Sequence, residues 1–88
     1  MSDAASGGGI NEADVLEYLR ESLFVDIAGI DGTTPLLSAG VIDSFALIEL
    51  LTYIEERAQV RFSAADATIE NLDSIDLILQ LVERTRAR

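Results

Sequence analysis

The chain has no cysteine, no histidine, no tryptophan and no lysine among its 88 residues. Without cysteine or histidine it can form neither a thiolate nucleophile, nor a serine–histidine relay, nor a zinc site of the usual ligands, and it has no imidazole base for neutral pH. Paired carboxylates remain possible as catalysts, but a domain of this size offers them no cleft. The inventory therefore argues against an enzyme, and no metal site is predicted.

The same inventory bears on location and size. The lack of cysteine removes any disulfide framework, no charged-then-apolar leader is present, and no apolar run approaches membrane-spanning length. We therefore expect a cytoplasmic protein without a membrane partner. With 49% apolar residues, the chain can close one compact core but not two. A single domain that acts as a monomer, with its function on the surface, is expected.

The charge is strongly negative and unevenly distributed. Sixteen acidic residues oppose six arginines, which gives a formal net charge of −10. Residues 1–56 hold eleven acids and one arginine, whereas residues 57–88 hold five of each. Such a surface repels nucleic acid, so no nucleic-acid partner is expected and basic proteins are the predicted partners.

The chain begins with a segment that cannot form a core. Residues 1–9 include three consecutive glycines and are predicted to be a flexible tail, and residues 10–88 form the domain. A first helix is predicted over residues 11–24, with Asn11 as its N-cap and acidic residues in its first turn. Its apolar stripe consists of Val15, Leu16, Leu19 and Leu23.

A long connection follows, from residue 25 to residue 43, and it contains three glycines and the only proline. It shows neither a helical nor a strand period, and long irregular connections in small domains are usually functional. We expect it to be ordered because apolar side chains pin it to the core. These are Ile30, Leu36, Leu37 and either Val41 or Ile42.

A second helix is predicted over residues 44–58, and its faces separate clearly on a helical wheel. The core side consists of Leu47, Leu50 and Ile54. A different side carries Phe45, Glu49, Thr52 and Glu56, and Ile48 and Glu55 lie between that side and Ser44. The outer face of this helix is therefore acidic and includes two apolar residues.

The remainder predicts two more helices. A short helix is expected over residues 68–72 with Thr68 as its cap, and a longer one over residues 74–86 with Ser74 as its cap. The last helix has an apolar face of Ile75, Ile78, Leu79 and Val82, and its final turn and end carry Arg84, Arg86 and Arg88, which complement the helix dipole. The fold class predicted is an all-α bundle of four helices.

The sequence Asp43-Ser44-Phe45 at a helix start is the candidate site. A lone serine hydroxyl with no base to activate it is implausible as a catalyst. It suits modification by another enzyme, because the long loop presents it and a helix N-terminus favours an incoming phosphate. The alternative is that Asp43 and Ser44 only cap the helix. Asp73-Ser74-Ile75 repeats the pattern, but it follows a short connection and opens a helix without an acidic outer face, so Ser44 is favoured.

The segment GVIDSF at 40–45, followed by LIEL at 47–50 and the acidic pair at 55–56, resembles the acyl carrier protein family, which includes peptidyl carriers. The resemblance extends from Asn11 to about Thr85, and the segment ENLDSI at 70–75 is similar to the junction of the third and fourth helices. It implies a four-helix carrier bundle with a long first loop and a short third helix.

In that family a phosphopantetheinyl transferase esterifies the serine with 4′-phosphopantetheine from coenzyme A, and the thiol of the arm carries acyl or aminoacyl groups as thioesters. By position, the resemblance implies Ser44 as the acceptor and Asp43 as its flanking residue. The cofactor would supply the thiol that the chain lacks. The other partners implied are an acyl- or aminoacyl-adenylating ligase or acyltransferase, and downstream synthases or transferases.

The outer face of the second helix matches the family surface that meets basic patches of partner enzymes. The resemblance gives Glu49, Glu55 and Glu56 this role, with Phe45, Ile48 and Thr52 beside them. Two alternatives stay open: the acids form an ordinary solvated face, and the apolar residues are partly buried against the preceding loop.

Three departures from the family pattern bear on the pathway. Phe45 replaces the commoner leucine, Ala46 stands where fatty-acid carriers often have an acidic residue, and Arg57 interrupts the usual acidic run. They favour a freestanding carrier of polyketide, nonribosomal peptide or related specialised biosynthesis. A D-alanyl carrier or a fatty-acid carrier is the alternative within the family. The alternative from another class is an unmodified helical adaptor that binds one partner through the same face.

Overall fold

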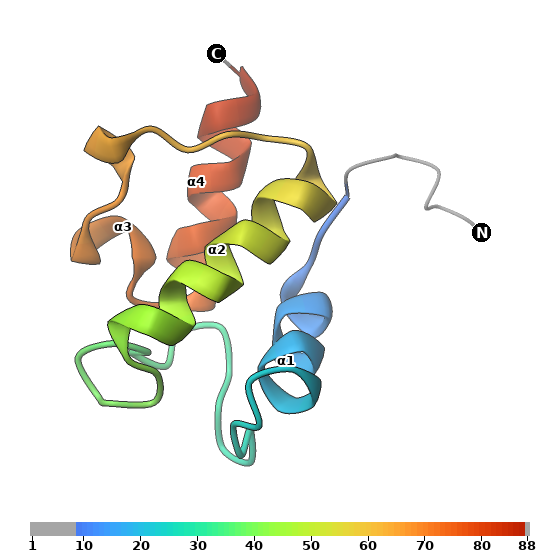
Figure 1. The fold of residues 1–88 in the computed structure, drawn as a ribbon, viewed down its shortest axis with the longest axis vertical. Helices are drawn as coiled ribbons and strands as arrows, with labels where there is room; N and C mark the ends of the chain where they lie inside the picture. Colours follow the sequence, from blue (N-terminus) through green and yellow to red (C-terminus); the bar gives the residue numbers. More distant parts are fainter. Residues whose placement is uncertain (1–8, 88) are drawn as a thin grey trace.

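The computed structural model describes residues 9–87, so most of the predicted tail at 1–9, and Arg88, lie outside the described residues. The described part contains helices and no strand, which confirms the predicted all-α bundle. The elements in order are α1 (Glu12–Glu21), α2 (Ser44–Ala58), the 3-10 helix η2 (Ala64–Asp66), α3 (Ile69–Leu72) and α4 (Ile75–Ala87) (Figure 1).

Helix α1 begins as predicted and ends earlier than predicted. Asn11 accepts a hydrogen bond from the Asp14 amide at 3.0 Å, and the Asp14 carboxylate accepts one from the Asn11 amide at 3.0 Å, so the two residues cap the helix reciprocally. The predicted end at Phe24 is wrong, because Phe24 adopts a left-handed φ of 58° and the Val25 amide turns back to the Leu19 carbonyl at 2.9 Å. Such a residue stops a helix.

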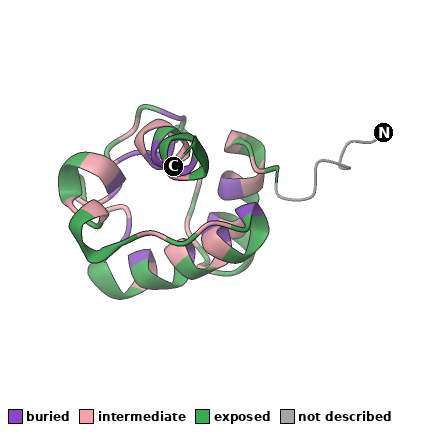
Figure 2. Cartoon of the chain, turned by 90° about the horizontal axis from the view of Figure 1, so that it is seen from above, coloured by how far each residue is buried: buried purple, intermediate pink, exposed green. Residues whose placement is uncertain are grey.

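The hydrophobic core lies where the apolar faces of the helices pack against one another. Figure 2 shows the buried residues on the parts of the ribbon that face the interior of the bundle. α1 packs on both α2 and α4, and α3 packs on α4. The predicted core side of α2 is confirmed, since Leu47, Leu50 and Ile54 are all buried. In α4, Leu79 is only half-buried and Leu81 completes the buried face instead.

The long loop is ordered against the core, as predicted. Leu36 is fully buried and Ile42 is 5% exposed, whereas Ile30 stays half-exposed and Ile27 packs against the core instead. The loop is also tied to α4, because the Asp76 amide donates to the Gly32 carbonyl at 2.9 Å. These contacts fix the segment that leads into α2.

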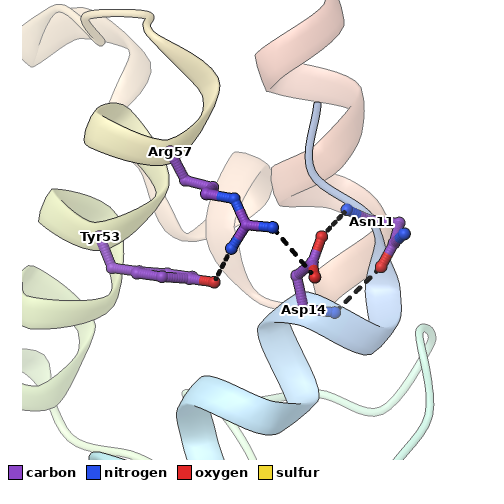
Figure 3. A network of polar contacts seen from close by, with 4 residues as sticks. All are labelled: Asn11, Asp14, Tyr53 and Arg57. Carbon is purple, nitrogen blue, oxygen red and sulfur yellow. Dashed lines mark hydrogen bonds and ion pairs between the residues drawn. The ribbon is translucent and has the colours of Figure 1, made fainter. Parts of the chain in front are cut away.

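A polar network joins α1 to α2 (Figure 3). Arg57, one of the departures from the family pattern, lies between the two helices. It donates to the Tyr53 hydroxyl at 3.0 Å and forms an ion pair with Asp14 at 3.5 Å. The ion pair is long and its Arg57 side chain is about half exposed, so its contribution to stability is small.

Candidate functional site

Ser44 is the first residue of α2, and the cap of that helix is made without it. The Asp43 carboxylate accepts a hydrogen bond from the Ala46 amide at 2.8 Å, and the Asp43 carbonyl accepts one from the Leu47 amide at 2.9 Å. The Ser44 side chain is exposed and its hydroxyl has no hydrogen-bond partner within residues 9–87. Asp43 therefore caps the helix, and the Ser44 hydroxyl is accessible to another molecule.

Ser74 has the same local sequence and the opposite environment. It is 7% exposed, and its hydroxyl oxygen accepts a hydrogen bond from the Leu77 amide at 3.1 Å, which is the predicted cap of α4. Access to this hydroxyl would require loss of the cap and opening of the core. The two serines therefore differ in exposure and in hydrogen bonding, and this difference favours Ser44 over Ser74 more strongly than their sequence context does.

The loop before Ser44 is held by its own backbone. The Gly40 amide donates to the Leu37 carbonyl at 3.1 Å, and the Ile42 amide donates to the Leu36 carbonyl at 3.1 Å. Gly40 has a φ of 76°, a left-handed conformation that a side chain would strain. With Leu36 and Ile42 buried, this turn sets the direction from which the chain enters α2.

Asp73 clamps the same loop from the junction of α3 and α4. One carboxylate oxygen accepts from the amides of Leu37 at 2.7 Å and Ser38 at 3.0 Å, and the other accepts from the Ser38 hydroxyl at 2.6 Å. The Asp73 carbonyl accepts from the Leu36 amide at 2.7 Å. The bond from the Ser38 side chain is the largest cause that lowers the pKa of Asp73. Sequence reasoning missed this role, because nothing local relates position 73 to positions 36–38.

We expect Asp73→Asn to lower the thermal stability of the domain and to speed hydrogen exchange at the Leu37 and Ser38 amides. Because the folded pKa of Asp73 lies below its ordinary value of 3.8, the ionised clamp stabilises the fold above that pH and is lost as the pH falls through the lower folded value. The difference in Tm between wild type and variant should be constant from neutral pH to about 4 and shrink below it. A difference that stays constant down to the acid limit would contradict the clamp.

An open groove of about 620 Å³ adjoins Ser44. Its walls are the end of the loop at Gly40 and Ile42, the start of α2 at Leu47, and α3 at Ile69 and Leu72. Ile69 is 61% exposed and extends this apolar surface outward. Nothing local in the sequence relates α3 to Ser44, because the two are about 25 residues apart. Their proximity depends on tertiary packing, which includes that of α3 on α4.

The outer face of α2 is as open as its pattern predicted. Phe45 is 73% exposed and Ile48 62%, which favours exposure over the alternative that they are partly buried against the preceding loop. Glu49, Thr52 and Glu56 are also exposed.

Glu55 differs from its neighbours on this face. It is half-buried, and its carboxylate accepts a hydrogen bond from the Phe62 amide at 2.8 Å. Its carboxylate therefore helps to hold the chain that leaves α2, a role that the sequence did not indicate.

Comparison of the sequence with models of known protein families assigns the family. A model of the phosphopantetheine attachment site family matches residues 13–82, and the chain belongs to that family. A search of curated proteins found no significant match. The class is therefore that of phosphopantetheine carriers, which interact with modifying and biosynthetic enzymes, and the cofactor is covalently attached 4′-phosphopantetheine. An exposed serine with an unbonded hydroxyl, beside an open groove, fits such a group.

Two further features of residues 9–87 concern other kinds of site. None of the described helices is long and apolar enough to cross a membrane. The described acidic residues form no group of three or more that could hold a metal ion.

Proposed function

We propose that Ser44 is the attachment point of 4′-phosphopantetheine. The observation that carries this proposal is the accessible, unbonded Ser44 hydroxyl at the first residue of α2, in contrast to the buried and bonded hydroxyl of Ser74. Asp43 would support the site by holding the first turn of α2, whose N-terminal dipole favours the phosphate. When bound, the arm supplies a thiol that carries acyl or aminoacyl groups as thioesters.

The chain itself would catalyse nothing and would present its cargo to partner enzymes. This part of the proposal rests on the absence of cysteine and histidine from the whole sequence, which removes the usual nucleophiles and bases. The partners would be a phosphopantetheinyl transferase, an acyl- or aminoacyl-adenylating ligase or acyltransferase, and downstream synthases or transferases, all in the cytoplasm.

These partners would contact the outer face of α2. Its exposed apolar residues adjoin Ser44, and its exposed acids concentrate negative charge along the same helix. Complementary charge speeds transient encounters with basic enzymes. The residues proposed for this contact are Phe45, Ile48, Glu49, Thr52, Glu55 and Glu56, with Glu55 contributing charge in addition to its bond to the Phe62 amide.

The pathway proposed is polyketide, nonribosomal peptide or related specialised biosynthesis, because Phe45, Ala46 and Arg57 depart from the pattern of fatty-acid carriers. Arg57 also has an internal role here, since it links Tyr53 to Asp14. The alternative within the family is a D-alanyl or fatty-acid carrier.

Mass spectrometry of the protein purified from its own host tests the carrier role and the pathway together. We expect a population heavier than the bare chain, from which collisional activation ejects a phosphopantetheine arm bearing an acyl or aminoacyl group. The composition of that group identifies the pathway class. A Ser44→Ala chain expressed in the same host is the control and should carry no arm. A native chain that is entirely unmodified would instead favour the helical adaptor.

A further inference from the structure

The turn of residues 36–42 leads into Ser44 and sets the position of its oxygen. The turn is closed by the hydrogen bond from the Ile42 amide to the Leu36 carbonyl at 3.1 Å. Both of these side chains are buried, whereas residues 38–40 between them are exposed. Ser44 comes only two residues after Ile42, so a shift of the turn moves the serine with it.

Asp73 binds this turn with its side chain and its backbone. The carboxylate accepts from the amides of Leu37 and Ser38 and from the Ser38 hydroxyl, and the Asp73 carbonyl accepts from the Leu36 amide. Within residues 9–87, the other hydrogen bonds of the turn are internal to it. Hydrogen bonds to an ionised acceptor are the stronger ones. Asp73 is therefore the hydrogen-bonding link between the turn and the remainder of the described structure.

The other end of this link rests on the core. The neighbours of Asp73 in the chain, Leu72 and Ser74, are both buried, and the Ser74 hydroxyl caps α4 by accepting from the Leu77 amide at 3.1 Å. The junction of α3 and α4 lies at the end of the bundle where α2 begins (Figure 1). Asp73 thus joins a fixed point of the fold to the turn that precedes Ser44.

We propose that Asp73 is a positioning residue for the attachment of phosphopantetheine, an inference that rests on the proposed attachment at Ser44. In that transfer the Ser44 oxygen bonds to the phosphorus of coenzyme A that bears pantetheine. The bond from this phosphorus to the bridging oxygen breaks, adenosine 3′,5′-bisphosphate leaves, and the hydroxyl proton passes to a base of the transferase. Because the attacking oxygen must be aligned with the leaving oxygen, a misplacement of about 1 Å lowers the rate strongly.

Positioning can be separated from stability because the carrier protein is itself the substrate of the transferase. If loss of the Asp73 carboxylate only unfolded part of the carrier, less competent substrate would be present, so the apparent KM would rise and kcat would not change. If the loss displaces Ser44 in a folded carrier that still docks through the outer face of α2, KM stays and kcat falls.

The test is the steady-state kinetics of a phosphopantetheinyl transferase on Asp73→Ala, which removes the carboxylate. We expect kcat to fall about tenfold and KM to stay within about twofold of wild type. A kcat equal to that of wild type, or a change confined to KM, would overturn the proposal.

Variants of Ser38 test the same link from the side of the turn. Ser38→Ala removes only the bond from the hydroxyl and should lower kcat about two- to threefold. Ser38→Thr keeps a hydroxyl and should restore the wild-type kcat. If Asp73→Ala fails to fold, these variants decide, since Ser38 is exposed and its replacement leaves the core intact. A wild-type kcat in Ser38→Ala would then refute the positioning role.

Asp31→Ala is the matched control. Asp31 also binds groups of the long loop with its carboxylate, namely the amide and hydroxyl of Thr33 and the hydroxyl of Thr34. None of these groups lies in the turn of residues 36–42. This variant should therefore lose stability and keep its kcat. A fall in kcat as large as that of Asp73→Ala would mean that any loosening of the loop slows the transfer, which contradicts a specific role of Asp73.

Hydrogen exchange in the unmodified protein gives a readout that does not need the transferase. The amides of Ile42 and Ala46, both hydrogen-bonded, lie on either side of Ser44. Asp73→Ala should speed exchange at these two amides more than at the bonded Val25 amide, which lies far along the loop from the turn. Equal acceleration at all three would indicate a general loss of stability and would count against the inference.

The two readouts distinguish this inference from the proposed function. A wild-type chain that no transferase modifies is a failure of the proposed attachment, and exchange at Ile42 and Ala46 still shows whether Asp73 positions Ser44. If wild type is modified at Ser44 while Asp73→Ala matches it in kcat and in exchange, only the inference about Asp73 fails.

Discussion

Replacing Ser44 with alanine is expected to abolish transfer of phosphopantetheine from coenzyme A by a promiscuous phosphopantetheinyl transferase. Ser74→Ala should be modified at a rate within about twofold of wild type. The loss should be complete because alanine leaves no hydroxyl at position 44 on which the phosphodiester could form, and the Ser44 hydroxyl makes no bond whose removal would disturb the fold. A fluorescent coenzyme A analogue, followed on a gel, measures both rates.

The two alanine variants should also differ in stability, and here Ser74→Ala, not Ser44→Ala, should show the larger loss. Ser74→Ala removes the hydroxyl that caps α4 through the Leu77 amide, which costs about 1 kcal/mol. Ser44→Ala should leave the melting temperature nearly unchanged. The less stable variant would thus be the one that is modified. Modification of Ser44→Ala at the wild-type rate would contradict the assignment of the site.

The second large effect concerns the charge of the outer face of α2. Reversing Glu49 and Glu56 to lysine should lower kcat/KM of the transferase by about 10- to 100-fold at low salt, because encounter with a basic enzyme is electrostatically steered. The effect should shrink as salt rises, since these exposed charges are screened. Glu55 is left unchanged, because its carboxylate binds the Phe62 amide and its reversal would disturb the chain after α2.

A matched control separates position from net charge. Glu17 of α1 and Glu83 of α4 are also exposed, and reversing both changes the net charge by the same amount. This variant should lose only a small part of the rate. If it loses as much as the α2 variant, the rate depends on net charge and not on the outer face of α2. A loss that does not change with salt would indicate disturbed packing instead.

Local patterns predicted the parts of the fold that depend on local contacts. The wheel of α2 separated the buried Leu50 and Ile54 from the exposed Phe45 and Ile48, because a helix face repeats with a fixed period. The end of α1 was missed because it depends on the left-handed backbone of Phe24, a conformation for which phenylalanine gives no sequence signal.

The candidate site likewise has features that local sequence predicted and features that depend on contacts between distant residues. Sequence context favoured Ser44 over Ser74, and the structure supplies a physical reason in their exposure and hydrogen bonding. The role of Asp73 could not be predicted, because its carboxylate binds amides some 35 residues earlier in the chain. The stacking of Tyr18 on Tyr53 is likewise a contact between helices, and no spacing in the sequence indicates it.

The most direct test of Ser44 is a tryptic map of the protein after incubation with coenzyme A and a phosphopantetheinyl transferase. Since the chain has arginine but no lysine, complete digestion places Ser44 in the peptide of residues 21–57 and Ser74 in the peptide of residues 62–84. We predict an intact mass increased by one phosphopantetheine, found in the first peptide and assigned by fragmentation to Ser44. No increase, or an increase confined to residues 62–84, would contradict the assignment.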